Sequence, residues 1–260
     1  MISITTQQWY AWITAFVWPF LRILGLMLSE PVLSNRSVPT SARVGLAIMV
    51  TLVVAPTLPP MPRVDPASAA GVFIAIQQLL IGLAMGFVMR IALTAAETAG
   101  QLGGLQMGLG FAVFFDPQST AQTAVVGQFL GLFAMLLFLS MNGHALVISA
   151  LAESFRVLPV AADPVNPIGW RVLAQWGGVI FTVGLLIALP VIAALLIANV
   201  AVGIMTRAAP QLNIFAVGFP VTLVTGFVAL YLAIPYIGPA LARLFEQAAG
   251  VMLRVAGALH

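Results

Sequence analysis

Three long stretches of the chain carry no Asp, Glu, Lys or Arg, and they constrain its fold more than any other feature. They run over residues 117–152, 172–206 and 208–242, and each is longer than thirty residues. A helix of about 20 apolar residues crosses a hydrocarbon core about 30 Å thick. Soluble domains carry about 25% charged residues, whereas this chain has 7%, with 62% hydrophobic residues. The sequence therefore predicts a polytopic membrane protein.

Composition excludes several classes of function. The chain has no cysteine and two histidines, which rules out thiolate metal sites and an imidazole cluster. All ten basic residues are Arg, and without Lys neither a Walker A phosphate loop nor a Schiff-base lysine exists. The pI near 10.2 reflects Arg residues spread along the chain without a basic face. We therefore expect no metal, no cofactor and no nucleic-acid partner.

Hydropathy divides the chain into six apolar segments, which we expect to be helices. Proline-rich loops separate the second segment from the third, over residues 55–62, and the fourth from the fifth, over residues 159–167. No linker or low-complexity tract divides the chain, so we predict a single domain over residues 1–260. The six segments are residues 9–28, 44–58, 71–93, 125–151, 172–205 and 214–242.

Prolines inside the last two segments predict broken helices. The fifth segment would be about 51 Å long as one straight helix, well beyond the hydrocarbon thickness. Pro190 lies at its middle, and the last segment contains Pro220 and Pro235. We expect proline-broken helical hairpins, with Pro190 as the natural break. Backbone groups that lose their hydrogen bonds at a broken helix must be satisfied by protein or water. The broken helices are therefore expected to lie in the interior of an assembly.

Glycines recur at four-residue spacing in the third and fourth segments and in the stretch between them. Such spacing lets membrane helices approach closely. The contacts can form inside this chain or with partner subunits, and the sequence does not decide between the two. The glycines are Gly82 and Gly86, Gly100 with Gly104 and Gly108, and Gly127 with Gly131.

Residues 100–117 form the least ordinary stretch. Five glycines in eleven residues disfavour a helix, because each costs about 1 kcal/mol relative to Ala, while Met107, Phe111, Phe114 and Phe115 supply apolar bulk. A mobile apolar loop of this kind can seal a pore. The alternative is a glycine-faced membrane helix packed against its neighbours. The spacing does not fit a dinucleotide fingerprint.

A few polar residues stand inside or beside the apolar segments. Arg90 and Glu97 are two helical turns apart, so they share a face, where they either pair, line a wet cavity or anchor the helix at the interface. His144 follows Asn142-Gly143 as either a helix end or a contact between subunits. We expect these residues to serve assembly or to make polar contacts within the membrane: Arg90, Glu97, Gln101, His144, Arg207, Gln211 and Asn213.

Several short motifs together resemble one known family across essentially the whole chain. The strongest is Arg-Ala-Ala-Pro-Gln-Leu-Asn at residues 207–213. The others are Gln-Met-Gly-Leu-Gly-Phe at 106–111, Asp116-Pro117, Asn-Gly-His at 142–144 and Ser154-Phe155. The pattern resembles the FliR family of flagellar export-gate membrane proteins and its relatives in virulence secretion systems.

The resemblance implies a noncatalytic subunit of a helical hetero-oligomeric export gate. In that family the subunit joins several copies of FliP and FliQ around a narrow conduit for unfolded exported proteins. It lies in the bacterial inner membrane at the flagellar basal body, with FlhA and FlhB as further membrane partners. The glycine- and phenylalanine-rich loop is thought to plug the closed conduit. Here that loop corresponds to Gln106, Met107, Gly108, Gly110, Phe111, Phe114, Phe115, Asp116 and Pro117.

Three other functions were weighed against the flagellar gate. The corresponding subunit of a virulence secretion system would share every motif. A small-molecule transporter would show similar broken helices. An intramembrane hydrolase could use Ser140, His144 and Asp116, and Ser140 and His144 share a helical face. However, neither a nucleophile elbow nor a metal-ligand spacing accompanies them, so we expect no enzyme.

Overall fold

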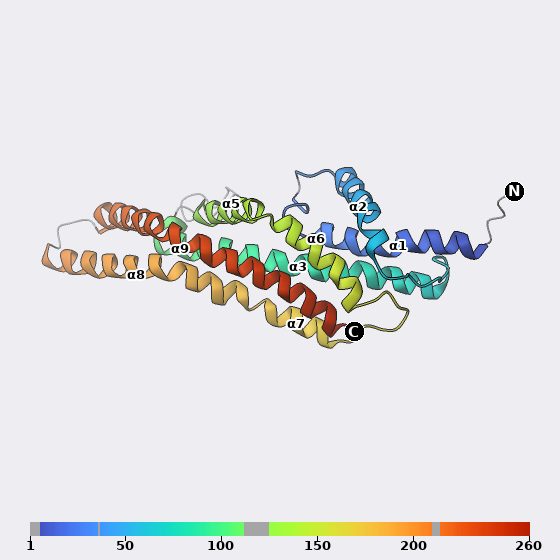
Figure 1. Cartoon of the computed structure of the whole chain (residues 1–260). Coiled ribbons are helices and arrows are strands. Elements are labelled where there is room, and N and C mark those ends of the chain that lie inside the picture. The colour runs from blue at the N-terminus through green and yellow to red at the C-terminus, as the bar shows by residue number, and fades with distance from the viewer. Residues whose placement is uncertain (1–5, 36, 112–124, 210–213) are drawn as a thin grey trace. The chain divides into compact units, whose positions relative to one another are not determined.

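The computed structural model describes residues 6–35, 37–111, 125–209 and 214–260, and these are almost entirely helical (Figure 1). No strand occurs among them, which confirms the predicted all-α fold. The α-helices are α1 (Thr6–Ser29), α2 (Thr40–Val54), α3 (Ala69–Gln106), α5 (Val125–Ser140), α6 (Gly143–Val157), α7 (Ile168–Trp176), α8 (Val179–Ala208) and α9 (Ile214–Ala258). Two short 3₁₀ turns, η1 (Ala55–Thr57) and η2 (Leu109–Phe111), follow α2 and α3.

Five helical segments in the described residues are long and apolar enough to cross a membrane. The number becomes six when the bent pair α5 and α6 counts as one span, in agreement with the predicted polytopic protein. The bend falls at Asn142, whose φ of 56° is left-handed, a conformation that Asn tolerates better than most residues. The five segments are Ala11–Ser29, Thr40–Thr57, Ala69–Gln106, Ile168–Ala208 and Val217–Ala258.

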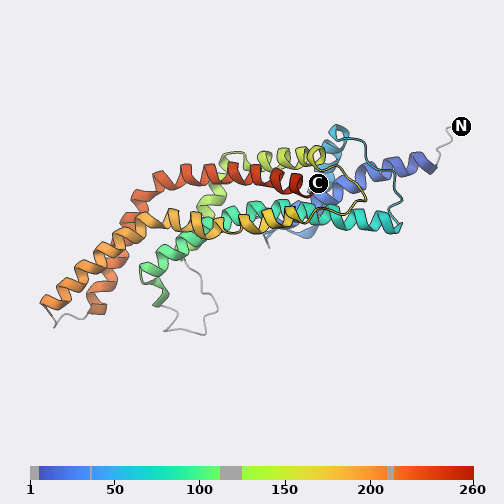
Figure 2. The ribbon, with the colours of Figure 1, turned by 90° about the horizontal axis from the view of Figure 1, so that it is seen from below.

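The prolines do not break the helices that contain them, so the predicted break at Pro190 is wrong. Pro190 lies inside α8, and Pro220 and Pro235 lie inside α9, as does Pro239. Figure 2 shows each helix as a continuous ribbon with a pronounced bend along its length. An interior proline removes one hydrogen bond and bends a helix, but ending the helix would leave several more backbone groups unpaired in an apolar region. The fifth segment divides instead at Gly177–Gly178, between α7 and α8.

The first part of the glycine-rich stretch is helical. α3 continues through Gly100, Gly103 and Gly104 and ends at Gln106, so the alternative of a glycine-faced helix is the one found for residues 100–106. Gly108 adopts a φ of 86°, which an L residue with a side chain rarely takes. This left-handed glycine explains why α3 cannot continue past it.

The chain forms two compact units. The first unit contains Met1–Ile91, Asn142–Gly177 and Phe245–His260, and the second contains Ala92–Met141 and Gly178–Leu244. The long helices α3 and α9 are each divided between the two units, α3 after Ile91 and α9 after Leu244.

In the first unit, α1 and the first part of α3 pack with their backbones in close contact (Figure 1). A methyl group on Gly25 would overlap Leu79 O, and one on Gly82 would overlap Arg22 O. A methyl group on Gly86 would overlap Ser29 Oγ and Leu26 O. Figure 1 shows that the two helices run in the same direction. Gly82 and Gly86 therefore serve packing within the chain.

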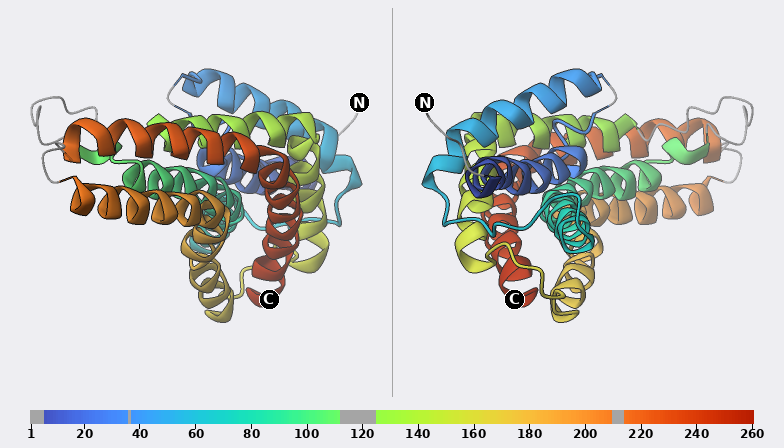
Figure 3. Two further views of the ribbon diagram at one scale, coloured as in Figure 1. Left: turned by 90° about the vertical axis from the view of Figure 1, so that its left-hand side faces the viewer. Right: turned by 90° about the vertical axis from the view of Figure 1, so that its right-hand side faces the viewer.

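In the second unit, the end of α3 lies between α8 and the first part of α9, and Figure 3 shows this arrangement from both sides. A methyl group on Gly100 would overlap Val126 O of α5, and one on Gly131 would press on the Glu97 side chain. On α8, a methyl group at Gly184 would press on Thr98. These glycines, too, pack inside the chain.

Candidate functional site

Arg22 is the most deeply buried charged side chain of the first unit, with no exposed surface. Its Nε donates to Gln78 Oε1 (2.8 Å), Nη1 to Ser154 Oγ (3.1 Å) and Nη2 to Leu158 O (3.0 Å). The guanidinium carbon also lies 4.1 Å from the centroid of the Phe155 ring. One side chain of α1 thus ties together α3, α6 and the residue after α6.

The three acceptors of Arg22 are neutral, so hydrogen bonds and the aromatic ring offset the cost of burying its charge. Removing the guanidinium would leave Gln78 Oε1 and Leu158 O buried without a donor, at about 1–3 kcal/mol each. Arg22 lies within the predicted apolar segment 9–28, and we predicted no partner for it from the sequence. Its position does indicate a role, because an ionisable residue within a membrane span is rare and usually functional.

The end of α1 is fixed by two further buried polar side chains. Ser29 Oγ donates to Leu83 O of α3 (2.9 Å). The carboxylate of Glu30 accepts from the backbone N–H of Val32 (3.0 Å) and Leu33 (2.9 Å), which closes the turn after the helix. Burial raises the pKa of Glu30 above its usual value, and the two backbone hydrogen bonds oppose that rise in part.

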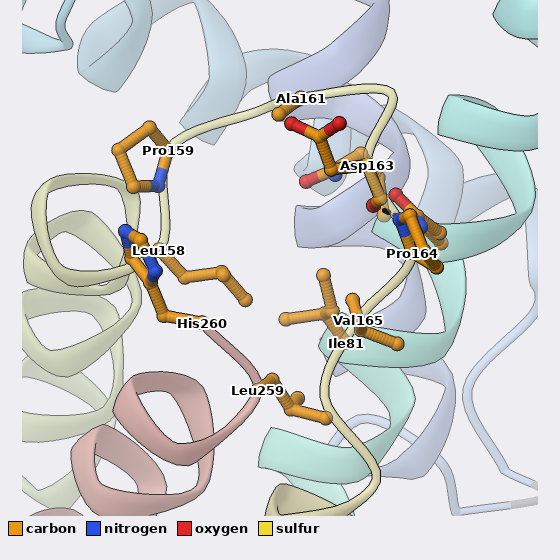
Figure 4. Close-up of a pocket in the computed structure, with 11 residues that line it drawn as sticks. Ile81, Leu158, Pro159, Ala161, Asp163, Pro164, Val165, Leu259 and His260 are labelled. Atoms are coloured by element: carbon orange, nitrogen blue, oxygen red, sulfur yellow. Dashed lines mark hydrogen bonds between the residues drawn. The ribbon is translucent and has the colours of Figure 1, made fainter.

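A cavity of about 200 Å³ lies in the first unit beside the Arg22 cluster (Figure 4). Gln78 and Leu158, which bind the guanidinium, also form part of its wall. Gln77 Nε2 donates to Asp163 O (2.8 Å) and holds the loop after α6 over α3. The remaining lining residues are Ile81, Pro159, Ala161, Pro164, Val165, Leu259 and His260.

In the second unit, the end of α3 is held by α9. Met107 has no exposed surface, and its carbonyl oxygen lies 3.3 Å from the hydroxyl of Thr222. Its side chain packs at Gly226, where a β-carbon would lie only 2.5 Å from Met107 Cγ. The backbone N–H of Met107 and Gly108 donate to Gly103 O and Leu105 O, each at 3.0 Å.

Only part of the predicted plug falls within the described residues. Gln106, Met107, Gly108 and Gly110 lie at the end of α3 and in η2, and Phe111 is the last residue of η2. Met107 is buried, whereas Gln106, Gly108 and Gly110 are partly exposed. The other predicted members, Phe114, Phe115, Asp116 and Pro117, lie outside the described residues.

The predicted polar positions that the structure describes lie on three helices, α3, α6 and α8. Each of Arg90 and Glu97 is exposed and has an interaction partner. Arg90 belongs to the first unit and Glu97 to the second. Gln101, His144 and Arg207 are exposed on α3, α6 and α8 respectively. Gln211 and Asn213 lie outside the described residues.

Of the three residues considered for hydrolysis, Ser140 and His144 lie within the described part of the chain. Ser140 Oγ donates to Leu137 O of its own helix (2.8 Å), which is ordinary for a serine near a helix end. His144 is exposed on α6, and Asp116 falls outside the described part of the chain. Across the residues that the structure covers, no three His, Asp or Glu side chains gather in a way that could hold a metal ion.

Comparison with known proteins agrees with the fold and the motifs. Residues 13–248 match the family model for bacterial export proteins, family 1. The flagellar biosynthetic protein FliR of Escherichia coli (strain K12) is 42% identical over 247 residues, covering 95% of this chain and 94% of that protein. The protein of the same name from Pectobacterium carotovorum subsp. carotovorum is 44% identical with the same coverage, and that of Bacillus subtilis (strain 168) is 29% identical over 221 residues, covering 83% and 84%. The chain therefore belongs to family 1 of the bacterial export proteins, the FliR family.

Proposed function

We propose that this chain is a membrane subunit of the bacterial flagellar type III protein export gate. In this proposal it assembles with FliP and FliQ into a conduit for unfolded flagellar proteins, in the inner membrane at the basal body beside FlhA and FlhB. It has no catalytic role, and energy for transport comes from other components. Membership of the export family and the named flagellar relatives support this assignment.

The observation that carries the proposal is the large apolar surface that the chain leaves uncovered. Within the last two candidate spans, Ile168–Ala208 and Val217–Ala258, only 28% and 22% of the most apolar window is buried inside the chain. Large side chains such as Phe181, Ile197 and Tyr236 are more than 70% exposed. An apolar surface of this extent is covered by lipid or by partner subunits. A subunit that encircles a conduit with its neighbours has this property.

The plug is assigned to residues 106–117. An apolar constriction excludes water and therefore blocks ions, yet it can yield to a bulky polypeptide. Phe111, Phe114 and Phe115 supply the apolar bulk, and Asp116-Pro117 ends the motif. Met107 supports this assignment, because it is buried against α9 and fixes the start of the segment.

Replacing Phe111, Phe114 and Phe115 together with Gly tests the plug. We expect cells that carry the assembled variant complex to leak small ions and molecules across the inner membrane. Phe73→Gly on α3 is the control, because that residue is 42% exposed, belongs to the first unit and lies outside the segment. Unchanged permeability in a variant complex that still assembles would count against the plug.

A virulence secretion subunit is the second candidate, because it would carry the same motifs. The relatives named above are flagellar proteins, which favours the flagellar assignment. A chromosomal deletion separates the two: loss of motility with restoration by this chain supports the flagellar gate. Loss of effector secretion with normal motility would support the virulence system.

A further inference from the structure

We infer that Thr222 and Gly226 on α9 form a seat for Met107, and that this seat sets where the glycine-rich segment leaves α3. The seat is built from described residues of the second unit alone. Its use in positioning a plug rests on the proposed function. The contacts themselves are independent of the proposed function.

Two contacts from one face of α9 hold Met107. Thr222 and Gly226 are four residues apart, so they lie about one helical turn apart on the same face of α9. The Thr222 hydroxyl lies 3.3 Å from Met107 O and 3.0 Å from Phe219 O of its own helix. Gly226 provides the space for the side chain, which has no exposed surface.

Gly226 fits this role because no larger residue leaves room for Met107. A β-carbon at position 226 would lie 2.5 Å from Met107 Cγ, 2.8 Å from Cε and 2.9 Å from Sδ. Because Cγ is close to the backbone, rotating the end of the side chain does not relieve the overlap. By contrast, a β-carbon at Gly238, also on α9 within the second unit, meets nothing within 4 Å.

The position of Met107 determines the path of the residues that follow. Gly108 is next in the chain, with its left-handed φ of 86°, and its N–H donates to Leu105 O (3.0 Å). η2 begins directly afterwards at Leu109. A shift of Met107 therefore changes the point at which α3 ends and η2 starts. We accordingly assign Thr222 and Gly226 as positioning residues for residues 108–111.

Cysteine labelling tests the seat, because the chain has no cysteine of its own. Leu109→Cys is the local reporter, and Leu195→Cys, at a fully buried position of α8 in the same unit, reports general loosening. The full chain is labelled with a maleimide in membranes, with and without Gly226→Ala. Gly238→Ala is the matched control, because it makes the same Gly→Ala change in the same helix where there is open space.

Gly226→Ala is expected to raise the labelling rate at position 109 by about tenfold, with no change at position 195, because an overpacked contact opens locally. Gly238→Ala should change neither rate. Met107→Ala combined with Gly226→Ala should raise the rate less than the two single changes predict together, since the new methyl group enters the vacated space. Equal rates at position 109 for Gly226→Ala and Gly238→Ala, or strictly additive effects, would overturn the seat.

If Gly226→Ala does not accumulate in the membrane, Thr222→Val replaces it in the same experiment. Valine keeps the shape and removes the hydroxyl, and we expect a smaller rise at position 109, of about twofold to fivefold. No rise would overturn the role of Thr222. Ion permeability of the same cells separates this inference from the proposed function. Faster labelling without a leak contradicts the plug and leaves the seat standing.

Discussion

The two units of the chain hold their helices together in different ways. In the first unit, buried polar side chains link the helices: Arg22 joins α1 to α3 and α6, and Ser29 joins α1 to α3. In the second unit, glycines such as Gly100 and Gly184 allow close approach, as Gly25 and Gly82 do in the first unit, and the Thr222 hydroxyl lies near Met107 O. α8 in that unit leaves Phe181 and Ile197 more than 70% exposed.

This difference concerns what fixes the packing of α1, α3 and α6, since α2 of the same unit leaves Val53 76% exposed. Buried hydrogen bonds in a low-dielectric interior specify one arrangement of helices, because any alternative leaves polar groups unpaired. Apolar faces lack that specificity and are satisfied by any apolar neighbour. We therefore interpret the packing of α1, α3 and α6 in the first unit as fixed by these buried hydrogen bonds. In the proposed gate, the second unit is completed by its partners.

Arg22→Met should have the largest effect among the changes to polar and glycine contacts. The variant keeps apolar bulk and leaves the buried acceptors of Gln78 and Leu158 without a donor, which costs about 3 kcal/mol or more of stability in total. Arg171→Met, at an exposed position of the same unit, should stay within about 0.5 kcal/mol. Thermal midpoints of the purified chains in detergent check this. Equal midpoints for the two variants would show that the first unit does not depend on its polar links.

Gly82→Ala should come next. The new methyl group overlaps Arg22 O of α1, and backbone atoms cannot rotate away as a side chain can, so we expect a loss of about 1–3 kcal/mol. Gly45→Ala, on α2 with open space around it, should instead stabilise the chain by about 0.5–1 kcal/mol. The same thermal measurement applies. A neutral Gly82→Ala would mean that α1 and α3 are not in the close contact described.

The Glu30 carboxyl makes a smaller, pH-dependent contribution to the stability of the first unit. Its pKa in the folded protein is raised by burial, so the folded state holds the proton more tightly than the unfolded state does. Stability should therefore fall as pH rises from the unfolded pKa to the higher folded pKa and stay flat above it. Glu30→Gln should remove this decline, whereas Glu246→Gln, at an exposed position, should leave it intact. Midpoints of both variants between pH 4 and 8 (about the range in which a raised carboxyl titrates) check the sign.

The smallest effect on the stability of the isolated chain is expected at the exposed apolar residues of α8. Ile197 is 72% exposed, whereas Ile187 on the same helix is 7% exposed. Ile187→Ala should cost about 2–5 kcal/mol in the isolated chain, and Ile197→Ala should change it by less than about 0.5 kcal/mol. With FliP and FliQ present, Ile197→Ala should weaken their association. An equal loss of stability from both changes in the isolated chain would remove the contrast between the two positions.

Much of the fold follows from local sequence properties. The six apolar segments and both proline-rich loops were predictable because burial in lipid and the missing N–H of proline act residue by residue. The position of the helix breaks was not. Pro190 stays within α8, because the helix tolerates one missing hydrogen bond better than a free end.

The cluster around Arg22 could be predicted only in part. That an arginine inside an apolar segment needs partners follows from the sequence. Its acceptors lie 56, 132 and 136 residues away in the chain, and no local pattern identifies them. Ser154-Phe155 did stand out as a motif, and the structure explains why both residues matter to Arg22: Ser154 accepts a hydrogen bond, and Phe155 lies against the guanidinium.

The most direct test of the account is whether FliP and FliQ cover the apolar face of α8. The affinity-tagged chain carrying Ile197→Cys is purified after expression alone or with both proteins, and its labelling by a maleimide is followed in each case. The account predicts a stable complex of all three proteins in which position 197 is labelled at least about tenfold more slowly than in the chain alone, as expected for a buried interface residue. A chain that purifies as a stable, solitary protein and shows the same labelling rate with and without FliP and FliQ would contradict it.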